Sequence, residues 1–186
     1  VQVFVHGGAW KNFSKDDYSF AADALVPAGI HTVVVNFTNL PKVRLPEMVA
    51  EVRRSVEWVH PHATSFGGDP QRLYLLAQSS GAHLSAMALC GHGASPGVPR
   101  DFIKGATLVS GPYYMEPVVL SARGSYVHLS GEEVRELMLG YRSLVADPPG
   151  GLDPWEGRHL HRVGDLGDSG AGVPSSPPLP IEPPVP

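Results

Sequence analysis

The feature that most constrains the fold is the run from Ile30 to Phe37, which is rich in β-branched side chains and scarcely alternates between apolar and polar residues. A strand with one face in water alternates with a period of two residues, whereas a strand covered on both faces does not. Strands of the second kind are typical of parallel sheets, in which crossover helices cover both faces. The run therefore predicts a buried strand of a parallel sheet.

Strand and helix patterns alternate along the remainder of the first 110 residues. Further strands are expected at residues 1–5, 72–77 and 103–109. Helices are expected at about 16–28, at 45–59 and at 80–89, the last apolar on nearly every side and so buried. Ser130 to Glu133 fits a capping box that opens one more helix. This alternation predicts an α/β fold with a doubly wound, mostly parallel sheet of about four recognisable strands.

Composition limits the number of domains and the classes of partner. The chain of 186 residues is long enough for one core, but from Asp147 to Pro186 10 of 40 residues are proline and 7 are glycine. We expect a partial domain over residues 1–145 and a mostly disordered tail over 146–186. A net charge of -4 without a basic cluster argues against a nucleic-acid partner, and no apolar run is long enough to span a membrane. The single cysteine, Cys90, favours a reducing, cytoplasmic location.

The most informative segment for chemistry is Ala77-Gln78-Ser79-Ser80-Gly81, between a predicted strand and the buried helix. It resembles a nucleophile elbow, in which a serine on a strained strand-to-helix turn exposes its hydroxyl above the sheet. Ser79 is then the nucleophile, and the Ser80 N–H at the helix start helps to stabilise an oxyanion. The alternative is that both serines cap an ordinary helix.

A second segment, His6-Gly7-Gly8-Ala9-Trp10, directly follows the first strand. Glycines remove side chains that would block a carbonyl, so such a loop can present consecutive backbone amides, although a plain turn has the same composition. Both segments are expected at the carboxyl ends of parallel strands, where sheets of this kind bind ligands.

These segments together resemble a family. The sequence is similar to α/β-hydrolases of the bacterial arylformamidase (kynurenine formamidase) and carboxylesterase group related to hormone-sensitive lipase. The resemblance covers about residues 1–145, and the family usually has Gly and His where this chain has Ala77 and Gln78. Besides the two loops, it rests on Thr32 to Asn36, Arg44 to Met48, Ser65 to Pro70, Gly81 to Leu84 and Leu108 to Tyr113.

The resemblance implies a mechanism without a metal or another cofactor. Gly7 and Gly8 supply oxyanion-hole amides, Trp10 lines the acyl or aryl pocket, and Ser79 forms an acyl-enzyme. The implied substrate is an aryl formamide such as N-formylkynurenine, an intermediate of tryptophan catabolism, or alternatively a small carboxylic ester.

The remaining triad members are not recognisable. In this fold the acid and the histidine follow the serine in chain order, on loops after further strands. His159 and His161 obey that order but lie in the proline-rich segment, so we expect the acid and base to lie outside this chain. A truncated, non-catalytic remnant is therefore the rival interpretation. His83, one helical turn after Ser79, is expected to point into the helix packing, and no histidine pair has a convincing metal-ligand spacing.

Overall fold

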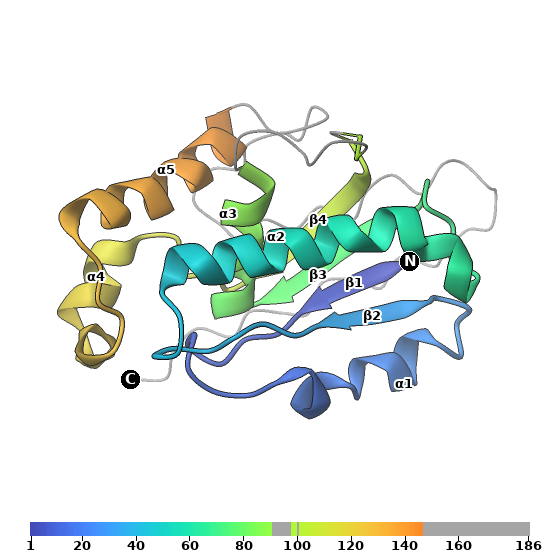
Figure 1. The fold of residues 1–186 in the computed structure, drawn as a ribbon, viewed down its shortest axis with the longest axis horizontal. Helices are drawn as coiled ribbons and strands as arrows, with labels where there is room; N and C mark the ends of the chain where they lie inside the picture. Colours follow the sequence, from blue (N-terminus) through green and yellow to red (C-terminus); the bar gives the residue numbers. More distant parts are fainter. Residues whose placement is uncertain (91–97, 100, 147–186) are drawn as a thin grey trace, which may run out of the picture.

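The computed structural model describes residues 1–90, 98, 99 and 101–146 (Figure 1). Its sheet has four parallel strands: β1 Gln2–Val5, β2 Thr32–Val35, β3 Leu73–Gln78 and β4 Ile103–Val109. They lie in the order β2-β1-β3-β4, and the register places Ala77 of β3 between Val5 and Leu108. The predicted α/β fold is confirmed, and the carboxyl ends of β1, β3 and β4 meet at one edge of the sheet.

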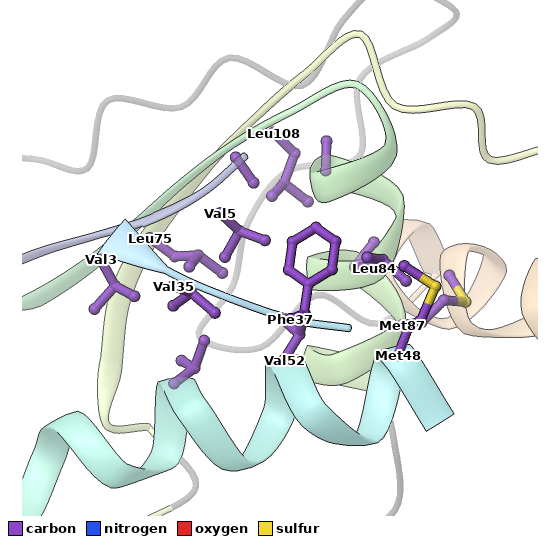
Figure 2. Packing of buried hydrophobic residues seen from close by; sticks show 14 of the residues in the cluster. Val3, Val5, Val35, Phe37, Met48, Val52, Leu75, Leu84, Met87 and Leu108 are labelled. Atoms are coloured by element: carbon purple, nitrogen blue, oxygen red, sulfur yellow. The ribbon is translucent and has the colours of Figure 1, made fainter. Parts of the chain in front are cut away.

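The core lies between this sheet and two helices, α2 (Leu45–His62) and α3 (Ser80–Cys90), which pack against each other (Figure 2). Strand residues such as Val5 and Leu75 meet Met48 and Val52 of α2 and Leu84 of α3. Eight of the eleven residues of α3 are buried, as its apolar composition predicts. The helix that follows Ser79 is thus held in the most densely covered part of the molecule.

Helix α2 confirms the predicted stripe of buried apolar residues but runs three residues beyond the predicted end at residue 59. Pro61 does not end it, since a proline in the last turn removes only one intrahelical hydrogen bond. The helical path continues as η2 (Ala63–Phe66) and stops at Gly67, whose φ of 82° is the left-handed conformation that glycine adopts easily.

The helix predicted over about 16–28 is wrong in extent. The structure has a 3-10 turn, η1 (Lys15–Tyr18), and a short helix, α1 (Ala21–Leu25), neither with a buried residue. Ser14 and Asp17 form a capping box that starts η1 early, and Pro27 lacks the N–H needed to extend α1. Phe20, counted as part of the apolar stripe, is exposed.

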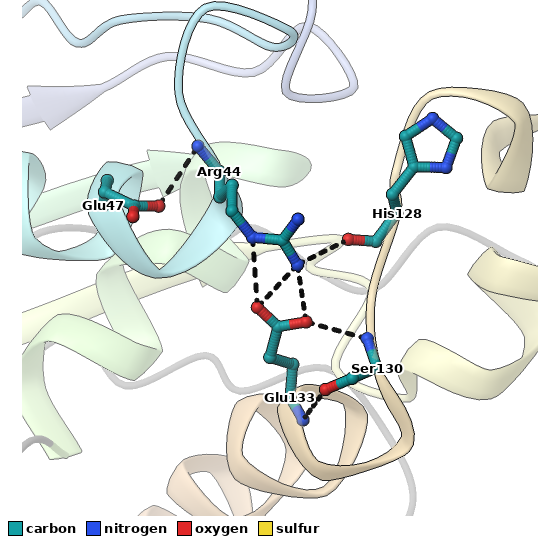
Figure 3. A network of polar contacts seen from close by, with 5 residues as sticks. All are labelled: Arg44, Glu47, His128, Ser130 and Glu133. Atoms are coloured by element: carbon teal, nitrogen blue, oxygen red, sulfur yellow. Dashed lines mark hydrogen bonds and ion pairs between the residues drawn. The ribbon is translucent and has the colours of Figure 1, made fainter.

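After β4 the chain forms α4 (Met115–Leu120), η3 (Ala122–Ser125) and α5 (Gly131–Ala146). The predicted capping box is present: Ser130 N–H donates to the Glu133 carboxylate, and Glu133 N–H donates to Ser130 Oγ. Glu133 also pairs with Arg44, at the start of α2, at 2.7 Å (Figure 3). Arg44 additionally donates to the His128 carbonyl, so this network fastens the start of α5 to the start of α2.

Strands β2 and β4 are the outer strands of the described sheet. Val35 is buried, but Thr32, Val33 and Val34 are only half-buried, because β2 has a neighbouring strand on one side alone. The prediction that this strand is fully covered is therefore wrong for most of its length. The tail predicted over 146–186 lies, apart from Ala146, outside the described residues. None of the described helices combines the length and apolar character needed to cross a membrane.

Candidate active site

Strained backbone is concentrated at the carboxyl edge of the sheet. Five non-glycine residues of the described chain have positive φ, and all lie in loops that follow β1, β3 or β4. They are Ala9, Trp10, Phe13, Ser79 and Ser110. Such conformations cost about 1–3 kcal/mol each and persist where the surroundings enforce them, often at functional sites. This edge is therefore the candidate active site.

Ser79 occupies the turn between β3 and α3 with a φ of 53°. Its N–H donates to the Val109 carbonyl at 2.7 Å, which ties the turn to the end of β4, and its carbonyl accepts from His83 N–H in the first turn of α3. Ala77 is buried in β3, and Gln78 is exposed. The local geometry is that of a strand-to-helix elbow, as the sequence predicts.

Two glycines allow this turn to lie against the loop that follows β1. A Cβ on Gly81 would collide with the carbonyl oxygens of Val5 and His6, so α3 approaches the end of β1 as closely as a backbone can. A Cβ on Gly7 would lie 3.1 Å from Ser79 Cβ. The predicted apposition of Ser79 and the Gly7-Gly8 loop is confirmed.

The orientation of the loop is set by His6. Its buried ring lies between Phe37 and Tyr18, at centroid distances of 4.3 and 5.4 Å, and its Nδ1 is 2.7 Å from the Gly7 carbonyl oxygen. Because that oxygen can only accept, Nδ1 carries the proton. In a trans peptide the C=O and the following N–H point in opposite directions. The Gly8 N–H therefore points away from the His6 ring. Burial lowers the pKa of His6, which favours its neutral form.

Gly8 itself requires the absence of a side chain. Its φ is 122°, and a Cβ there would overlap the Asn12 carbonyl oxygen. The Gly8 carbonyl accepts from both Lys11 N–H and Asn12 N–H, which closes the loop tightly. The buried Ser80 begins α3, so its N–H lies at the positive end of the helix dipole. The roles of Gly7, Gly8 and Ser80 as oxyanion donors stay predictions.

Trp10, predicted to line the acyl or aryl pocket, is only 1% exposed. Its indole lies perpendicular to the His83 ring, with centroids 5.5 Å apart. His83 is fully buried, which confirms that it points into the packing, and burial lowers its pKa to about 4. A base with so low a pKa and no access to the site is unsuited to activate a serine near pH 7.

Within the described residues, no histidine or carboxylate side chain forms a hydrogen bond with the Ser79 hydroxyl. His159 and His161 lie outside that part of the chain. The same part contains no group of three or more His, Cys, Asp or Glu side chains arranged to hold a metal ion. The site thus brings together the predicted nucleophile and amides, without an identified base.

Sequence reasoning missed the support of the loop by His6, Tyr18 and Phe37. Their ring contacts join three segments, and no periodic pattern links residues at such separations. The only local signal is the histidine that precedes the two glycines.

A parallel sheet with helices on its faces and a serine in a left-handed strand-to-helix turn defines the α/β-hydrolase fold. An esterase from the archaeon Pyrobaculum calidifontis shares this fold, with a TM-score of 0.53 and 20% identity over 74% of this chain and 45% of that one. The BD-FAE family model matches residues 1–95, half of the chain, and the chain belongs to this family.

Two curated relatives refine this assignment. Kynurenine formamidase from Danio rerio is 40% identical over 117 residues, which are 63% of this chain and 38% of the relative. Esterase LipQ from Mycobacterium tuberculosis is 28% identical over 159 residues, which are 81% of this chain and 35% of the relative. The chain thus spans less than two fifths of the length of these relatives.

Proposed function

We propose that this chain carries the nucleophile and the oxyanion hole of a serine hydrolase that acts on a small ester or an aryl formamide. The observation that carries the proposal is the left-handed Ser79 at the β3–α3 turn, with the Gly7 backbone against its Cβ. A serine that merely caps a helix has no need of this strained conformation, since cap residues adopt extended backbone angles.

In the proposed reaction, Ser79 Oγ attacks the carbonyl carbon of the substrate. The negative charge that develops on the carbonyl oxygen is stabilised by the amides of Gly7, Gly8 and Ser80. The carbon–oxygen bond of an ester, or the carbon–nitrogen bond of a formamide, then breaks, and the proton that the Ser79 hydroxyl has lost ends on the leaving alcohol or amine. Water hydrolyses the acyl-enzyme and regenerates Ser79.

Two substrate classes fit this chemistry. The 40% identity to a kynurenine formamidase favours an aryl formamide of the N-formylkynurenine type. The longer match to LipQ, over 81% of the chain, favours a small carboxylic ester as the second candidate. Contact of Trp10 with either substrate requires its indole to move, because it is buried. The cytoplasmic location expected from the single cysteine stays a prediction.

Covalent labelling of Ser79 tests the proposal. An alkyl fluorophosphonate, followed by peptide mass spectrometry, is expected to modify Ser79 in the wild-type chain, slowly because no base has been identified to activate it, and to modify nothing in Ser79→Ala. Ser110→Ala is the matched control, because Ser110 also has a left-handed backbone at the end of the neighbouring strand. Labelling that persists in Ser79→Ala, or that is lost in Ser110→Ala, would contradict the assignment of the nucleophile.

Turnover distinguishes a complete enzyme from a remnant without a base. Loss of a triad member typically lowers the rate by several orders of magnitude. We therefore expect the 186-residue chain to hydrolyse p-nitrophenyl acetate and N-formylkynurenine very slowly. A turnover of about 10 per second, the median for enzymes, that disappears in Ser79→Ala would show that the chain contains a base.

A further inference from the structure

Trp10 combines a strained backbone with a side chain that is buried in the packing. Ala9 and Trp10 are consecutive non-glycine residues with φ of 52° and 62°. The Trp10 carbonyl accepts from Leu40 N–H at 2.8 Å. Its indole Nε1 has no hydrogen-bond partner among the described residues. The side chain is therefore held by packing, and that packing must offset the strain of the turn.

The ring that Trp10 meets belongs to the helix that starts at the nucleophile. His83 N–H donates to the Ser79 carbonyl, so His83 lies one helical turn from Ser79. His83 is fully buried, and its imidazole is perpendicular to the indole of Trp10. The contact thus joins the far end of the Gly7-Gly8 loop to the first turn of α3.

The near end of the same loop is fixed by the backbone. Gly7 lies against Ser79, and Gly81 lies against the carbonyls that end β1. Between these contacts and Trp10, the described residues restrain the loop by the bonds from Lys11 N–H and Asn12 N–H to the Gly8 carbonyl and by the contact of His6 Nδ1 with the Gly7 carbonyl. The loop is thus attached to α3 at two points, of which one is made of glycine backbone and the other is the pair of rings.

We propose that Trp10 is a positioning residue, which packs against His83 and so fixes the Gly7-Gly8 amides relative to Ser79, and does not contact substrate. The catalytic meaning of this role rests on the proposed function. The packing role itself does not, since it concerns the conformation of the loop alone.

Amide hydrogen exchange at Lys11 and Asn12 tests the packing role directly. His83→Ala and Trp10→Leu are expected to raise exchange at these amides by about tenfold or more, because both remove the ring contact. His83→Phe, which keeps a planar ring of similar size, is expected to retain wild-type protection. Met87→Ala is the matched control, since it removes a buried side chain from the next turn of α3.

Unchanged exchange at Lys11 and Asn12 in His83→Ala would overturn the proposal, as would an equal increase in Met87→Ala. If Trp10→Leu does not fold, the comparison of exchange in His83→Ala with exchange in His83→Phe is sufficient to test the packing role. Hydrogen exchange does not require the chain to be active.

A second readout separates positioning from contact with substrate. The rates at which a small and a bulky fluorophosphonate label Ser79 are measured in wild type, His83→Ala and Trp10→Phe. A positioning residue lowers both rates by the same factor, at most about 100- to 1000-fold, which is the effect of losing one oxyanion donor outright. A changed ratio between the two reagents would show that Trp10 touches the bound group and would overturn the proposal.

Wild-type labelling no faster than in Ser79→Ala would instead contradict the proposed function. In that case hydrogen exchange still decides whether the two rings hold the loop.

Discussion

Helices α3 and α1 both pack near strands of the same sheet, yet their environments differ completely. Eight of the eleven residues of α3 are buried, whereas none of the five residues of α1 is. Strand β3, which leads into α3, has a neighbour on each side, and α3 contacts both α2 and α5. Strand β2, which follows α1, has β1 on one side only, and Phe20 and Val26 beside α1 are 63% and 56% exposed.

This contrast explains where strain is tolerated. The left-handed turns at Ser79 and Trp10 adjoin the most buried helix, whose packing is rigid enough to enforce them. The α1–β2 margin contributes little burial, and it contains neither Ser79 nor any of the predicted oxyanion donors. The candidate site therefore depends on the α3 side of the molecule, and the margin is expected to tolerate change.

The largest expected effect is the loss of a core side chain from α3. Leu84 is fully buried, and Leu84→Ala should lower the free energy of unfolding by about 2–5 kcal/mol, through lost transfer energy and the cavity left behind. Leu25→Ala is the matched control on α1, where the same truncation of a half-buried residue should cost about 1 kcal/mol or less. Urea unfolding measures both. Similar losses would contradict the difference between the two helices.

The next effect is a dependence on pH that arises from the α3 side. The pKa of His83 is about 4 in the folded chain because of burial, against about 6.5 when exposed. Between these values the unfolded chain binds more protons, so stability falls as the pH decreases from about 6.5 to about 4. The shift corresponds to a loss of about 3 kcal/mol.

Urea unfolding at several pH values is expected to show this loss in the wild type and a much smaller one in His83→Phe. A weaker dependence should remain in His83→Phe, because burial also lowers the pKa of His6. An identical pH dependence in both chains would mean that His83 does not lie neutral in the core.

The α3 side was also the part that the sequence predicted best. The predicted bounds of the strand 103–109 and of the buried helix after Ser79 agree with the structure to within a residue. Continuous apolar segments that lie between turn residues allow few alternative bounds for a strand or a helix. The apposition of Ser79 and the Gly7-Gly8 loop followed from the rule that parallel strands end at the same edge. The contact between the rings of Trp10 and His83 was not predictable. Helical spacing shows which face of a helix points inward, but not which residues of other segments that face contacts.

The α1 margin was predicted least well. Apolar residues recur there at helical spacing, but α1 and η1 bury none of their residues, so packing does not stabilise one long helix. The helix boundaries are set instead by local signals, the capping box of Ser14 and Asp17 and the proline after Val26. The Arg44–Glu133 pair was missed for another reason, because its members are 89 residues apart and each also fits a local helix cap.

A third prediction concerns association through the open edge of β2. The Gln2 N–H donates to the His31 carbonyl, and in a parallel ladder this register turns the N–H of Val33 toward β1 and that of Thr32 away from the sheet. Edge groups of this kind pair with other chains. We expect the isolated chain to self-associate or to be loosely packed.

Thr32→Pro should reduce this association, since it removes an outward donor and leaves the ladder to β1 intact. Val33→Pro is the control, because it removes a donor inside the ladder and should destabilise the sheet. Size-exclusion chromatography with light scattering and thermal unfolding measures both effects. A monodisperse wild-type monomer with a sharp unfolding transition would contradict the prediction.

The smallest expected effect is at the Arg44–Glu133 pair, which joins the two sides of the helical layer at the starts of α2 and α5 (Figure 3). Arg44 lowers the pKa of Glu133, but its guanidinium is exposed, and exposed pairs contribute little because solvent screens them. Arg44→Met should therefore lower Tm by at most a few degrees, and less at high salt. Glu133→Ala should cost more, because it removes both the ion pair and the carboxylate that caps the Ser130 N–H at the start of α5. Thermal unfolding of both variants at low and high salt measures the difference. A larger loss from Arg44→Met than from Glu133→Ala would show that the guanidinium, and not the helix cap, holds α5 in place.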